Sequence, residues 1–276
     1  MLTFMFWNVP KKPNEERIAR LAHRYAVDVL ILAECDIEPQ ALLPLLNRGL
    51  ELAEYHYHAN KACELINVYS RFALEELSIG FEAARYTIRL LELPDNAPIA
   101  ICMAHIPSKL HYTDEDQTTE LVAMSRDIRE FEEKQGSRRT IVVGDMNVNP
   151  FEAGMAKCDG LHGVMARGVA LKQSREVQGR EYPFFYNPMW SHFGDGNSTP
   201  PGTYYDKQST PHKYFWNMFD QVLIRPDLLP YFDDRDLQIV TKVETESLLR
   251  RSGIPNPRIS DHLPIVFKLR LAEEEV

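Results

Sequence analysis

The chain has 276 residues, of which 44% are hydrophobic and 26% are charged, and its formal net charge at pH 7 is −9. This composition is typical of a soluble globular protein with a sizeable core. The acidic balance argues against tight, nonspecific binding along DNA, although a bound divalent ion can supply positive charge at a single phosphate. The purest apolar run, Val27 to Ala33, includes Asp28 and is too short to span a bilayer.

The cysteines and the first residues indicate the compartment. The four cysteines are widely spaced and form no Cys-x-x-Cys pair: Cys35, Cys63, Cys102 and Cys158. We expect buried, reduced thiols rather than a disulfide framework. Met1 to Asn8 has neither a basic region nor a cleavage site and is typical of a core strand rather than a signal peptide. The sequence therefore predicts a cytoplasmic protein with one domain over residues 1–276.

The first elements form a strand, a helix and a second strand. Leu2 to Val9 is a hydrophobic strand, and Asn14 can cap the helix that follows it. Val27 to Ala33 is then a buried strand. This order predicts a crossover between two parallel strands, which places Asn8 and Glu34 at the same edge of a sheet.

The middle of the chain alternates strands and helices. We expect a helix over Gln40 to Leu52, short strands over Leu65 to Phe72 and Ser78 to Phe81, and a hairpin of Tyr86 to Leu93 and Ile99 to Ala104 around Asp95 and Asn96. His105 follows this hairpin. A long helix then begins after Thr113 and ends at Gly136, a residue suited to a C-cap.

The most informative stretch runs from Thr140 to Asn149. Its first four residues are β-branched, as in a strand buried on both faces. We expect Gly144 to let the backbone turn, so that Asp145 and Asn147 emerge at the carboxyl end of the strand, where α/β sheets bind ligands, and point the same way. Gly, Asp and Asn also form plain turns, and that alternative stays open for this stretch alone.

The pattern weakens after Phe151, and residues 172–182 are polar and predicted to form a surface loop. Two aromatic groups follow, which can stack nucleobases or simply pack in the core. From them we select as substrate-binding candidates Trp190, Tyr204 and Trp216. Nearby side chains are weaker candidates for the same role: His192, Lys207, His212 and Lys213.

The last motif, Ser260-Asp261-His262, places an acid and an imidazole directly before an apolar strand. Such a pair suits the activation of water. A further strand, Phe219 to Ile224, has Asp220 near its start. With Trp7-Asn8, Leu32-Ala33-Glu34 and Gly144-Asp145-Met146-Asn147, these motifs resemble the endonuclease/exonuclease/phosphatase superfamily over nearly the whole chain. That family includes pancreatic-type deoxyribonucleases, abasic-site endonucleases, sphingomyelinases and inositol-polyphosphate phosphatases.

The resemblance implies an α/β fold, a four-layer sandwich of two packed mixed β-sheets flanked by helices. It implies a site for Mg²⁺ or Mn²⁺ with hard oxygen ligands from Asn8, Glu34 and Asp261. It also implies five catalytic residues: His105, Asp145, Asn147, Asp220 and His262. In this scheme Asp220 orients His262, which acts as a general base or as a hydrogen-bond donor to phosphate. Asp145 holds or activates the water, Asn147 orients the phosphate, and His105 donates to the phosphate or the leaving oxygen.

We therefore expect a metal-dependent phosphodiester hydrolase. The favoured hypothesis is an endonuclease that acts on DNA rather than RNA. The alternatives are a phosphatase or phosphodiesterase acting on a lipid or inositol phosphate, and a binding module without catalysis. The sequence indicates neither a membrane segment nor a protein partner. It also shows no clustered basic stretch, so we expect nucleic-acid binding to depend on salt as for two or three phosphate contacts.

Overall fold

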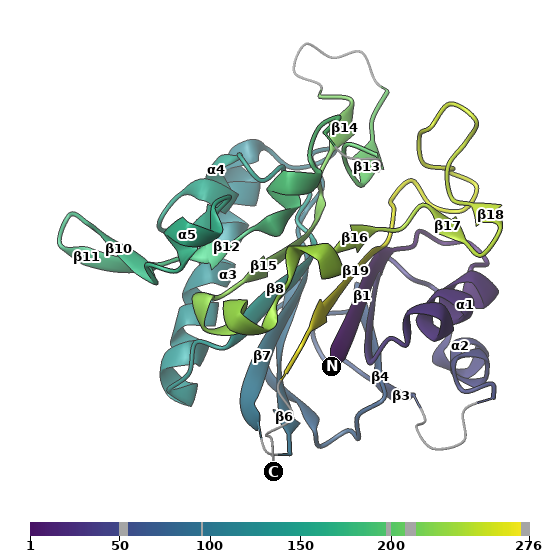
Figure 1. Cartoon of the computed structure of the whole chain (residues 1–276), viewed down its shortest axis with the longest axis horizontal. Helices are drawn as coiled ribbons and strands as arrows, with labels where there is room; N and C mark the ends of the chain where they lie inside the picture. The colour runs from purple at the N-terminus through teal and green to yellow at the C-terminus, as the bar shows by residue number, and fades with distance from the viewer. Residues whose placement is uncertain (50–54, 95, 197–199, 208–213, 272–276) are drawn as a thin grey trace.

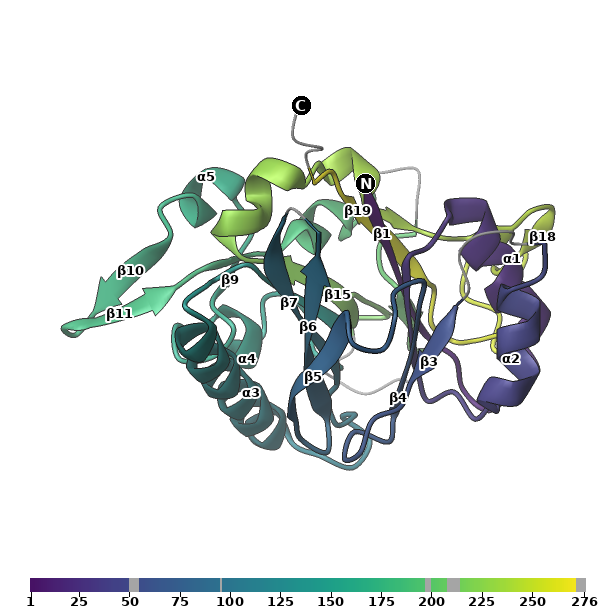
Figure 2. The same ribbon diagram turned by 90° about the horizontal axis from the view of Figure 1, so that it is seen from below.

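A computed structural model describes residues 1–49, 55–94, 96–196, 200–207 and 214–271 of the chain. Two large mixed β-sheets stack face to face, and helices cover their outer sides (Figure 1). Seen from below, α3 lies on one side of the pair of sheets and α1 and α2 lie on the other (Figure 2). The predicted four-layer α/β sandwich is therefore confirmed.

The first sheet has six strands in the order β16 (Gln238–Ile239), β19 (Ile265–Leu269), β1 (Leu2–Asn8), β2 (Val29–Ala33), β4 (Ile66–Ser70) and β3 (His56–His58). The second has seven strands in the order β5 (Leu77–Glu82), β6 (Tyr86–Leu93), β7 (Asn96–His105), β8 (Thr140–Asp145), β15 (Asp220–Ile224), β12 (Phe185–Tyr186) and β9 (Gly163–Val164). Within them, β1 is parallel to β2, as the crossover predicts, and β7 is parallel to β8.

Three two-stranded ribbons lie outside the large sheets: β10 (Ser174–Val177) with β11 (Arg180–Pro183), β13 (Tyr204–Tyr205) with β14 (Trp216–Asn217), and β17 (Lys242–Val243) with β18 (Glu246–Ser247). The α-helices are α1 (Glu15–Tyr25), α2 (Pro39–Leu46), α3 (Asp114–Gln135), α4 (Ala153–Ala156) and α5 (Arg167–Ala170). Short 3₁₀ turns are η1 (Pro188–His192), η2 (Pro226–Tyr231) and η3 (Asp234–Asp236). None of the helices in the described ranges is both long and apolar enough to cross a membrane.

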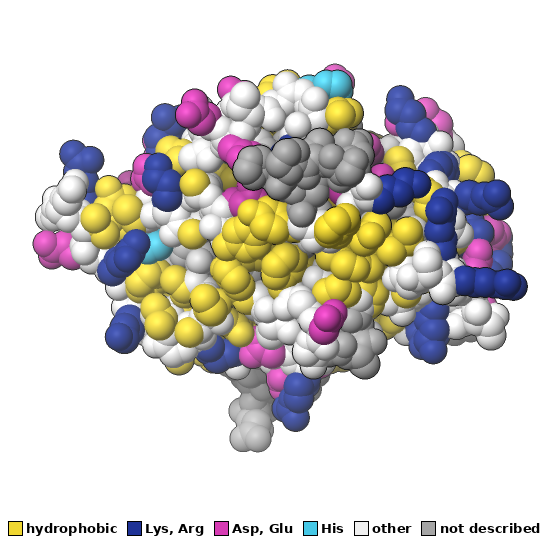
Figure 3. Space-filling view, turned by 90° about the horizontal axis from the view of Figure 1, so that it is seen from above, with side chains coloured by type: hydrophobic (Ala, Val, Ile, Leu, Met, Phe, Trp, Pro, Cys, Tyr) yellow, Lys and Arg dark blue, Asp and Glu magenta, His cyan; other side chains and the backbone are white. Residues whose placement is uncertain are grey.

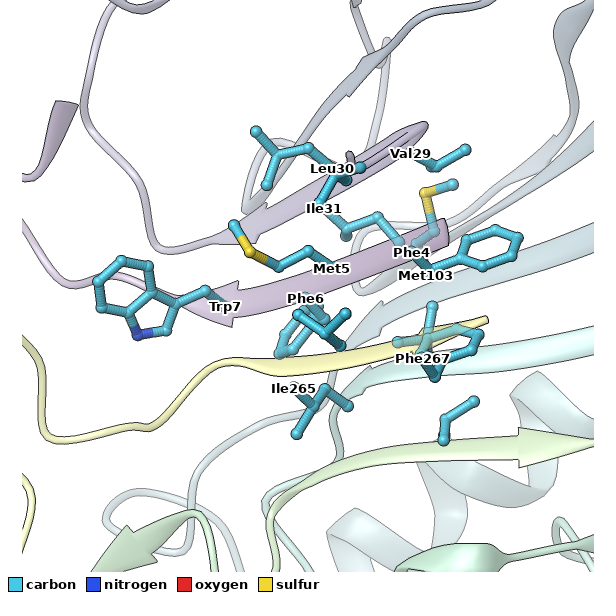
Figure 4. Close-up of a cluster of buried hydrophobic side chains, with 14 of the residues drawn as sticks. Phe4, Met5, Phe6, Trp7, Val29, Leu30, Ile31, Met103, Ile265 and Phe267 are labelled. Carbon is cyan, nitrogen blue, oxygen red and sulfur yellow. The ribbon is translucent and has the colours of Figure 1, made fainter. Parts of the chain in front are cut away.

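The main core lies between the two sheets, and β1 runs through it with every residue buried (Figure 4). Phe4 stacks on Phe267 of β19, with ring centroids 4.8 Å apart and planes 6° from parallel. Met103 of the second sheet belongs to the same core cluster. Because side chains from both sheets interdigitate here, the polar residues at the ends of these strands are held on a rigid base.

Gly144 has a different role from the predicted turn. It lies within β8, and a Cβ atom at this position would stand 2.0 Å from the carbonyl oxygen of Ala104 in the neighbouring strand β7. Only a residue without a side chain allows the two backbones to approach this closely. The glycine therefore permits the pairing of β7 with β8 that brings their ends together.

The helix predicted over residues 40–52 is shorter in the structure. α2 ends at Leu46, because the side chain of Asn47 bonds to both backbone groups of Tyr55, accepting from its N–H (2.5 Å) and donating to its carbonyl (3.2 Å). Residues 50–52 lie outside the described part of the chain. Asn14 precedes α1 but makes no side-chain cap; it donates instead to the carbonyl of Ile259 (2.9 Å).

The surface loop predicted over residues 172–182 is wrong, because this segment contains the hairpin of β10 and β11. Val177 pairs with Arg180, and the two residues between them, Gln178 and Gly179, have φ values of 51° and 75°. Two left-handed residues in a two-residue connection are typical of a tight hairpin turn. Its strands are largely exposed, so they lack the apolar alternation that identifies a strand in sequence.

All four cysteines are free: Cys35, Cys63, Cys102 and Cys158. The first three are buried and the last is half-buried. The predicted burial is confirmed for the first three and is incomplete for Cys158.

Candidate active site

The registers of three strands bring the predicted catalytic residues to one edge of the second sheet. His105 of β7 lies beside Asp145 of β8 in the parallel pair, and Asp220 of β15 faces Asp145 in the antiparallel pair. In the first sheet, Asn8 is the last residue of β1 and Glu34 directly follows β2. Because the sheets stack, these two edges meet, as the strand-end pattern predicts.

Asp145 lies at the centre of this group and is almost completely buried, with 1% exposure. Its Oδ2 accepts hydrogen bonds from Asn8 Nδ2 (2.9 Å) and Asn147 Nδ2 (3.2 Å), while its Oδ1 accepts from the Asn147 backbone N–H (2.9 Å). Asn147 has a φ of 50°, so its backbone is left-handed rather than extended. This turn points its amide back toward the carboxylate of Asp145.

Glu34 lies at the open side of the group and also has a left-handed backbone, with φ at 52°. Its Oε1 is 2.8 Å from His105 Nε2 and accepts from Asn8 Nδ2 (3.3 Å). The hydrogen bond from His105 outweighs the opposing effect of burial and lowers the pKa of Glu34 to about 2. Glu34 is therefore an anion throughout the physiological range, as a ligand for a hard cation must be.

His262 and Asp220 form a buried pair between the two sheets. Nδ1 of His262 lies 2.9 Å and 3.1 Å from the two carboxylate oxygens of Asp220. Burial lowers the pKa of His262, but the charges of Asp220 and Asp145 outweigh it and raise the pKa to about 10. Burial also raises the pKa of Asp220. We assign the shared proton to His262, because two carboxylates face the imidazole.

Two neighbouring aromatic side chains fix the position of His262. The ring of Tyr204 lies 4.8 Å from the imidazole, centroid to centroid, and is itself stacked on Phe219 at 5.3 Å. The indole N–H of Trp7 donates to the carbonyl of His262 (3.1 Å). The imidazole is thus held from its edge by Asp220 and from its face by Tyr204.

The side chains form two groups that can hold a metal ion, with ligand atoms within 4.8 Å of one another: Glu34, His105 and Asp145, and Asp145, Asp220 and His262. Asn8 adds a further observation, because its Oδ1 is buried and has no hydrogen-bond partner among the described residues. A buried carbonyl oxygen without a partner is costly unless a cation or a water satisfies it. The donor set of the first group, with Asn8, fits an oxygen-preferring divalent cation.

Glu34, Asp145, Asn147 and His262 line an open cavity of about 850 Å³. Its acidic lining residues are Glu34, Asp114, Asp145, Glu152, Asp206 and Asp261. Among the described residues, Lys109 is the one lysine or arginine in the lining, and it already pairs with Asp114 (2.9 Å) and Glu152. The cavity also has an aromatic wall, formed by Phe151, Tyr204, Tyr214 and Phe219.

The substrate-binding candidates are distributed unevenly. Tyr204 lines the cavity, but Trp190 and Trp216 are not part of its lining in the described structure. Trp190 packs beside Phe151 with centroids 6.2 Å apart, and Trp216 packs edge-on against Tyr205 at 5.2 Å. Both tryptophans thus contact other aromatic side chains, which is the core-packing alternative considered from the sequence.

The remaining candidates have different positions. Asp261 lines the cavity but lies outside both close groups of ligand atoms. His192 is half-buried and Lys207 is exposed, and neither lines the cavity in the described structure. His212 and Lys213 lie outside the described residues.

Sequence reasoning missed Phe151 and Lys109. Phe151 follows the Gly-Asp-x-Asn motif by four residues, and this proximity to the motif was the available signal. Lys109 lies in an irregular segment between β7 and α3 that has no pattern of its own. Its position depends on its ion pairs with Asp114 and Glu152, which only the folded chain brings together.

This fold is that of the α/β-sandwich phosphoester hydrolases. The chain belongs to the Endonuclease/Exonuclease/phosphatase family, whose sequence model matches residues 5–262. No curated protein sequence shows a significant match to the chain.

Solved structures with the same fold differ strongly in sequence. An abasic-site (AP) endonuclease from Archaeoglobus fulgidus is 16% identical, with a TM-score of 0.57 over 98% of this chain and 100% of its own. A 3′ phosphatase from Neisseria, bound to a product DNA hairpin, is 14% identical, with a TM-score of 0.55 over 98% and 99%. The catalytic domain of human Nocturnin is 16% identical, with a TM-score of 0.55 over 96% and 93%. At these identities the likeness shows the fold.

Proposed function

We propose that the protein is a divalent-metal-dependent phosphodiester hydrolase, an endonuclease acting on DNA. The observation that supports this most directly is the pair of side-chain groups around Asp145: a carboxylate-rich group with Glu34 and a His–Asp pair with His262. One group suits a cation that binds phosphate oxygens, and the other suits proton donation to the same phosphate. Glu34, Asp145 and His262 of these groups line one open cavity.

Glu34 and Asn8 would hold Mg²⁺ or Mn²⁺, with Asp261 as a further carboxylate on the cavity wall. Glu34 is anionic and Asn8 has an unpartnered Oδ1, so both present hard oxygen atoms. When bound, the ion offsets the negative charge that builds on the phosphate oxygens during hydrolysis.

The proton steps belong to the protein side chains. The raised pKa of His262 favours the imidazolium at neutral pH, so it would donate a hydrogen bond to a phosphate oxygen rather than act first as a base. Its Nε2 lies 3.9 Å from Asp145 Oδ2, and a water held there would lose its proton to Asp145 as its oxygen bonds to phosphorus. His105 would donate to the leaving oxygen as the P–O bond breaks. Asn147 would orient the phosphate.

The choice of DNA is supported by the cavity and by the substrates of two structural relatives. The aromatic wall offers flat surfaces on which bases can stack. The similar structures include an AP endonuclease and a phosphatase bound to a DNA hairpin. DNA is therefore the first substrate to test.

The second candidate is a phosphatase or phosphodiesterase on a lipid or inositol phosphate. Inositol phosphatases have a Trp-Cys-Asp type of sequence where this chain has Phe219-Asp220-Gln221. The cavity is also rich in carboxylates, which would repel a ligand with several phosphates. A binding module without catalysis is less favoured because the full set of polar residues is present, and each of them except Asp261 forms a hydrogen bond with another member of the set.

The test is hydrolysis of plasmid DNA, single-stranded DNA, RNA and bis(4-nitrophenyl) phosphate by the purified protein, in Mg²⁺, in Mn²⁺ and in EDTA. We expect metal-dependent nicking of plasmid and hydrolysis of the chromogenic diester, both lost in Asp145→Asn. Hydrolysis of a phosphoinositide or lysophospholipid, with no cleavage of any nucleic acid, would favour the second candidate. The cytoplasmic location and the single domain stay predictions of the sequence.

A further inference from the structure

Residues 249–256 form a tight turn on the surface, shortly before the last motif. The backbone N–H of Arg250 donates to the carbonyl of Ile254 (2.8 Å), and that of Gly253 donates to the carbonyl of Arg250 (2.9 Å). Gly253 has a φ of 81°, which favours glycine. These bonds hold Arg250 and Arg251 at the exposed tip of the turn.

Four basic side chains far apart in the sequence gather around this turn: Lys12, Arg250, Arg251 and Arg258. We call them the basic flank. Lys12 lies just before α1, and its Nζ donates to the carbonyl of Pro257, which joins it to the residue before Arg258. The three arginines are exposed. Figure 3 shows Lys and Arg side chains gathered at the end of the molecule that contains α1, β17 and β18.

Three acidic side chains on the elements next to the basic flank have other partners. Asp36 pairs with Lys11 (3.1 Å), Glu16 with Arg48 (3.3 Å) and Glu246 with Arg17 (2.6 Å). Within the described ranges, none of the four basic side chains of the flank forms an ion pair. The flank therefore keeps its positive charge on a protein whose formal net charge is −9.

The basic flank is attached directly to the candidate active site. The segment that contains Arg258 continues into Ser260, whose hydroxyl donates to the carbonyl of Asn8 (2.8 Å) and accepts from the backbone N–H of His262 (3.0 Å). The residue between them, Asp261, lines the cavity. Three positions along the chain therefore separate Arg258 of the flank from the cavity lining at Asp261.

From this arrangement we propose that the basic flank binds the phosphate backbone of the nucleic-acid strand whose phosphodiester enters the cavity. The choice of ligand rests on the proposed function. Among the described residues, the cavity lining has six carboxylates and a single lysine that is already paired, so the protein cannot attract a polyanion there without a cation. The basic flank supplies the electrostatic attraction for the phosphate backbone that the cavity lacks. Binding of the strand and hydrolysis of the phosphodiester are then carried out by different groups of residues.

A nucleic acid fits the basic flank better than an anionic membrane does. Binding at a lipid surface uses apolar side chains that enter the bilayer together with basic residues. The large hydrophobic residues with high exposure include Leu110 and Tyr214, but within residues 9–20 and 241–260, all of which are described, there is none. A charged surface without such residues suits a phosphodiester backbone.

The experiment compares two triple variants that each remove three positive charges. One replaces the flank, Arg250→Gln with Arg251→Gln and Arg258→Gln. The matched control replaces three exposed residues, Lys172→Gln with Arg175→Gln and Arg180→Gln, around the hairpin of β10 and β11, at the opposite end of the molecule in Figure 1. Binding of a single-stranded DNA 20-mer and of its duplex is measured against salt at fixed Mg²⁺, in an Asp145→Asn background.

Four phosphate contacts predict a slope of log K against log salt of about −3 to −4, steeper than the sequence alone suggests. The flank variant should lose about 2 to 3 units of slope and roughly tenfold or more in affinity at low salt, while the control stays within about twofold. Equal losses in both variants, or none in the flank variant, would overturn the inference. So would loss of binding to phosphatidylserine vesicles with unchanged DNA binding.

Hydrolysis of bis(4-nitrophenyl) phosphate, measured with the wild-type residue at position 145, keeps the two proposals apart. The flank variant should hydrolyse this small diester within about twofold of the wild-type rate, because its changes lie outside the cavity lining. DNA binding that depends on the flank, with no hydrolysis of any diester, would support the flank and overturn the proposed function. Hydrolysis of a diester without flank-dependent DNA binding would support the proposed function and overturn the role of the flank.

Discussion

The imidazole of His262, which precedes β19 of the first sheet, is hydrogen-bonded at 2.9 Å to Asp220, the first residue of β15 in the second sheet. The pair therefore exists only when the two sheets are stacked. Asp145 lies within 3.9 Å of the same imidazole, on the side of Nε2. Two carboxylates thus face one imidazole, which explains both its raised pKa and its proposed role as a proton donor.

Replacement of either central residue should remove activity without unfolding the protein. General acid–base groups contribute ~10²–10⁴-fold each, so Asp145→Ala and His262→Ala should each reduce kcat for the diester by about 10²-fold or more. The measurement is the initial rate on bis(4-nitrophenyl) phosphate, with circular dichroism to verify folding. His111→Ala, an exposed histidine outside the cavity lining, is the control and should retain full activity. A rate within a few-fold of wild type in either central variant would contradict the assignment.

The charge of His262 should change at unusually high pH in the metal-free protein. Its pKa is raised to about 10, so the imidazolium is present at neutral pH and is lost as pH rises through that value. The stability that this ion pair contributes is complete below the ordinary pKa of about 6.5 and declines between there and about 10. The pKa is measured by nuclear magnetic resonance titration of the imidazole in EDTA. Asp220→Asn should lower the midpoint, and a wild-type midpoint at or below 6.5 would refute the charge assignment.

Much of the site could be predicted because it depends on strand ends. Asn8, His105 and Asp145 are each the last residue of a buried strand, and hydrophobic runs identify such strands reliably. Parallel pairing then brings two of these ends together without any knowledge of the loops. Glu34 follows the same logic, one residue beyond β2.

Other parts depend on contacts that no local pattern encodes. In the sequence, Trp190, Trp216 and Tyr204 are equivalent candidates, because each is an aromatic residue in the same loop region. Only the packing of the loops decides that Tyr204 lines the cavity while the tryptophans do not. Lys12 and Arg258 are likewise 246 positions apart, so their common surface could not be read from a search for clustered charges. Asn14 looks like a helix cap but bonds to Ile259 of the distant last motif.

The metal requirement should depend on Glu34. We expect activity only with Mg²⁺ or Mn²⁺, full loss in EDTA, and recovery on adding the ion back. Glu34→Gln should raise the metal concentration needed for half-maximal rate, because a neutral amide is a weaker ligand for a hard cation than a carboxylate. Glu38→Gln, at an exposed position four residues later, is the matched control and should leave that concentration unchanged. Undiminished activity in excess EDTA would exclude the metal role.

The stability of the second sheet should depend on the missing side chain at position 144. Gly144→Ala places a Cβ where Ala104 already has backbone atoms, so the strands must separate, at a cost of ~1–3 kcal/mol or more in the free energy of unfolding. Gly168→Ala is the control, because a Cβ there meets nothing within 4 Å. Urea denaturation should show a lower midpoint for the first variant and an unchanged or higher midpoint for the second. Equal midpoints would mean that β7 and β8 adapt without loss.

The aromatic wall should bind a base of the nucleic-acid substrate. Tyr214 is 57% exposed and lines the cavity, and it meets Phe151 edge-on with centroids 5.2 Å apart. Its face is therefore available for stacking, which is worth ~1–3 kcal/mol per base, so Tyr214→Ala should raise KM for DNA by roughly 5- to 150-fold. Phe215→Ala, next to it but outside the lining, should change KM little.

An abasic substrate separates stacking from general damage to the site. A DNA strand that lacks one base next to the scissile bond should bind wild type more weakly, and the Tyr214→Ala change should then add no further loss. Kinetics of the four combinations of protein and substrate give the coupling between the side chain and the base. If the loss caused by Tyr214→Ala is the same with and without the base, at every position of the missing base near the scissile bond, then Tyr214 does not stack on a nucleobase and the wall serves packing alone.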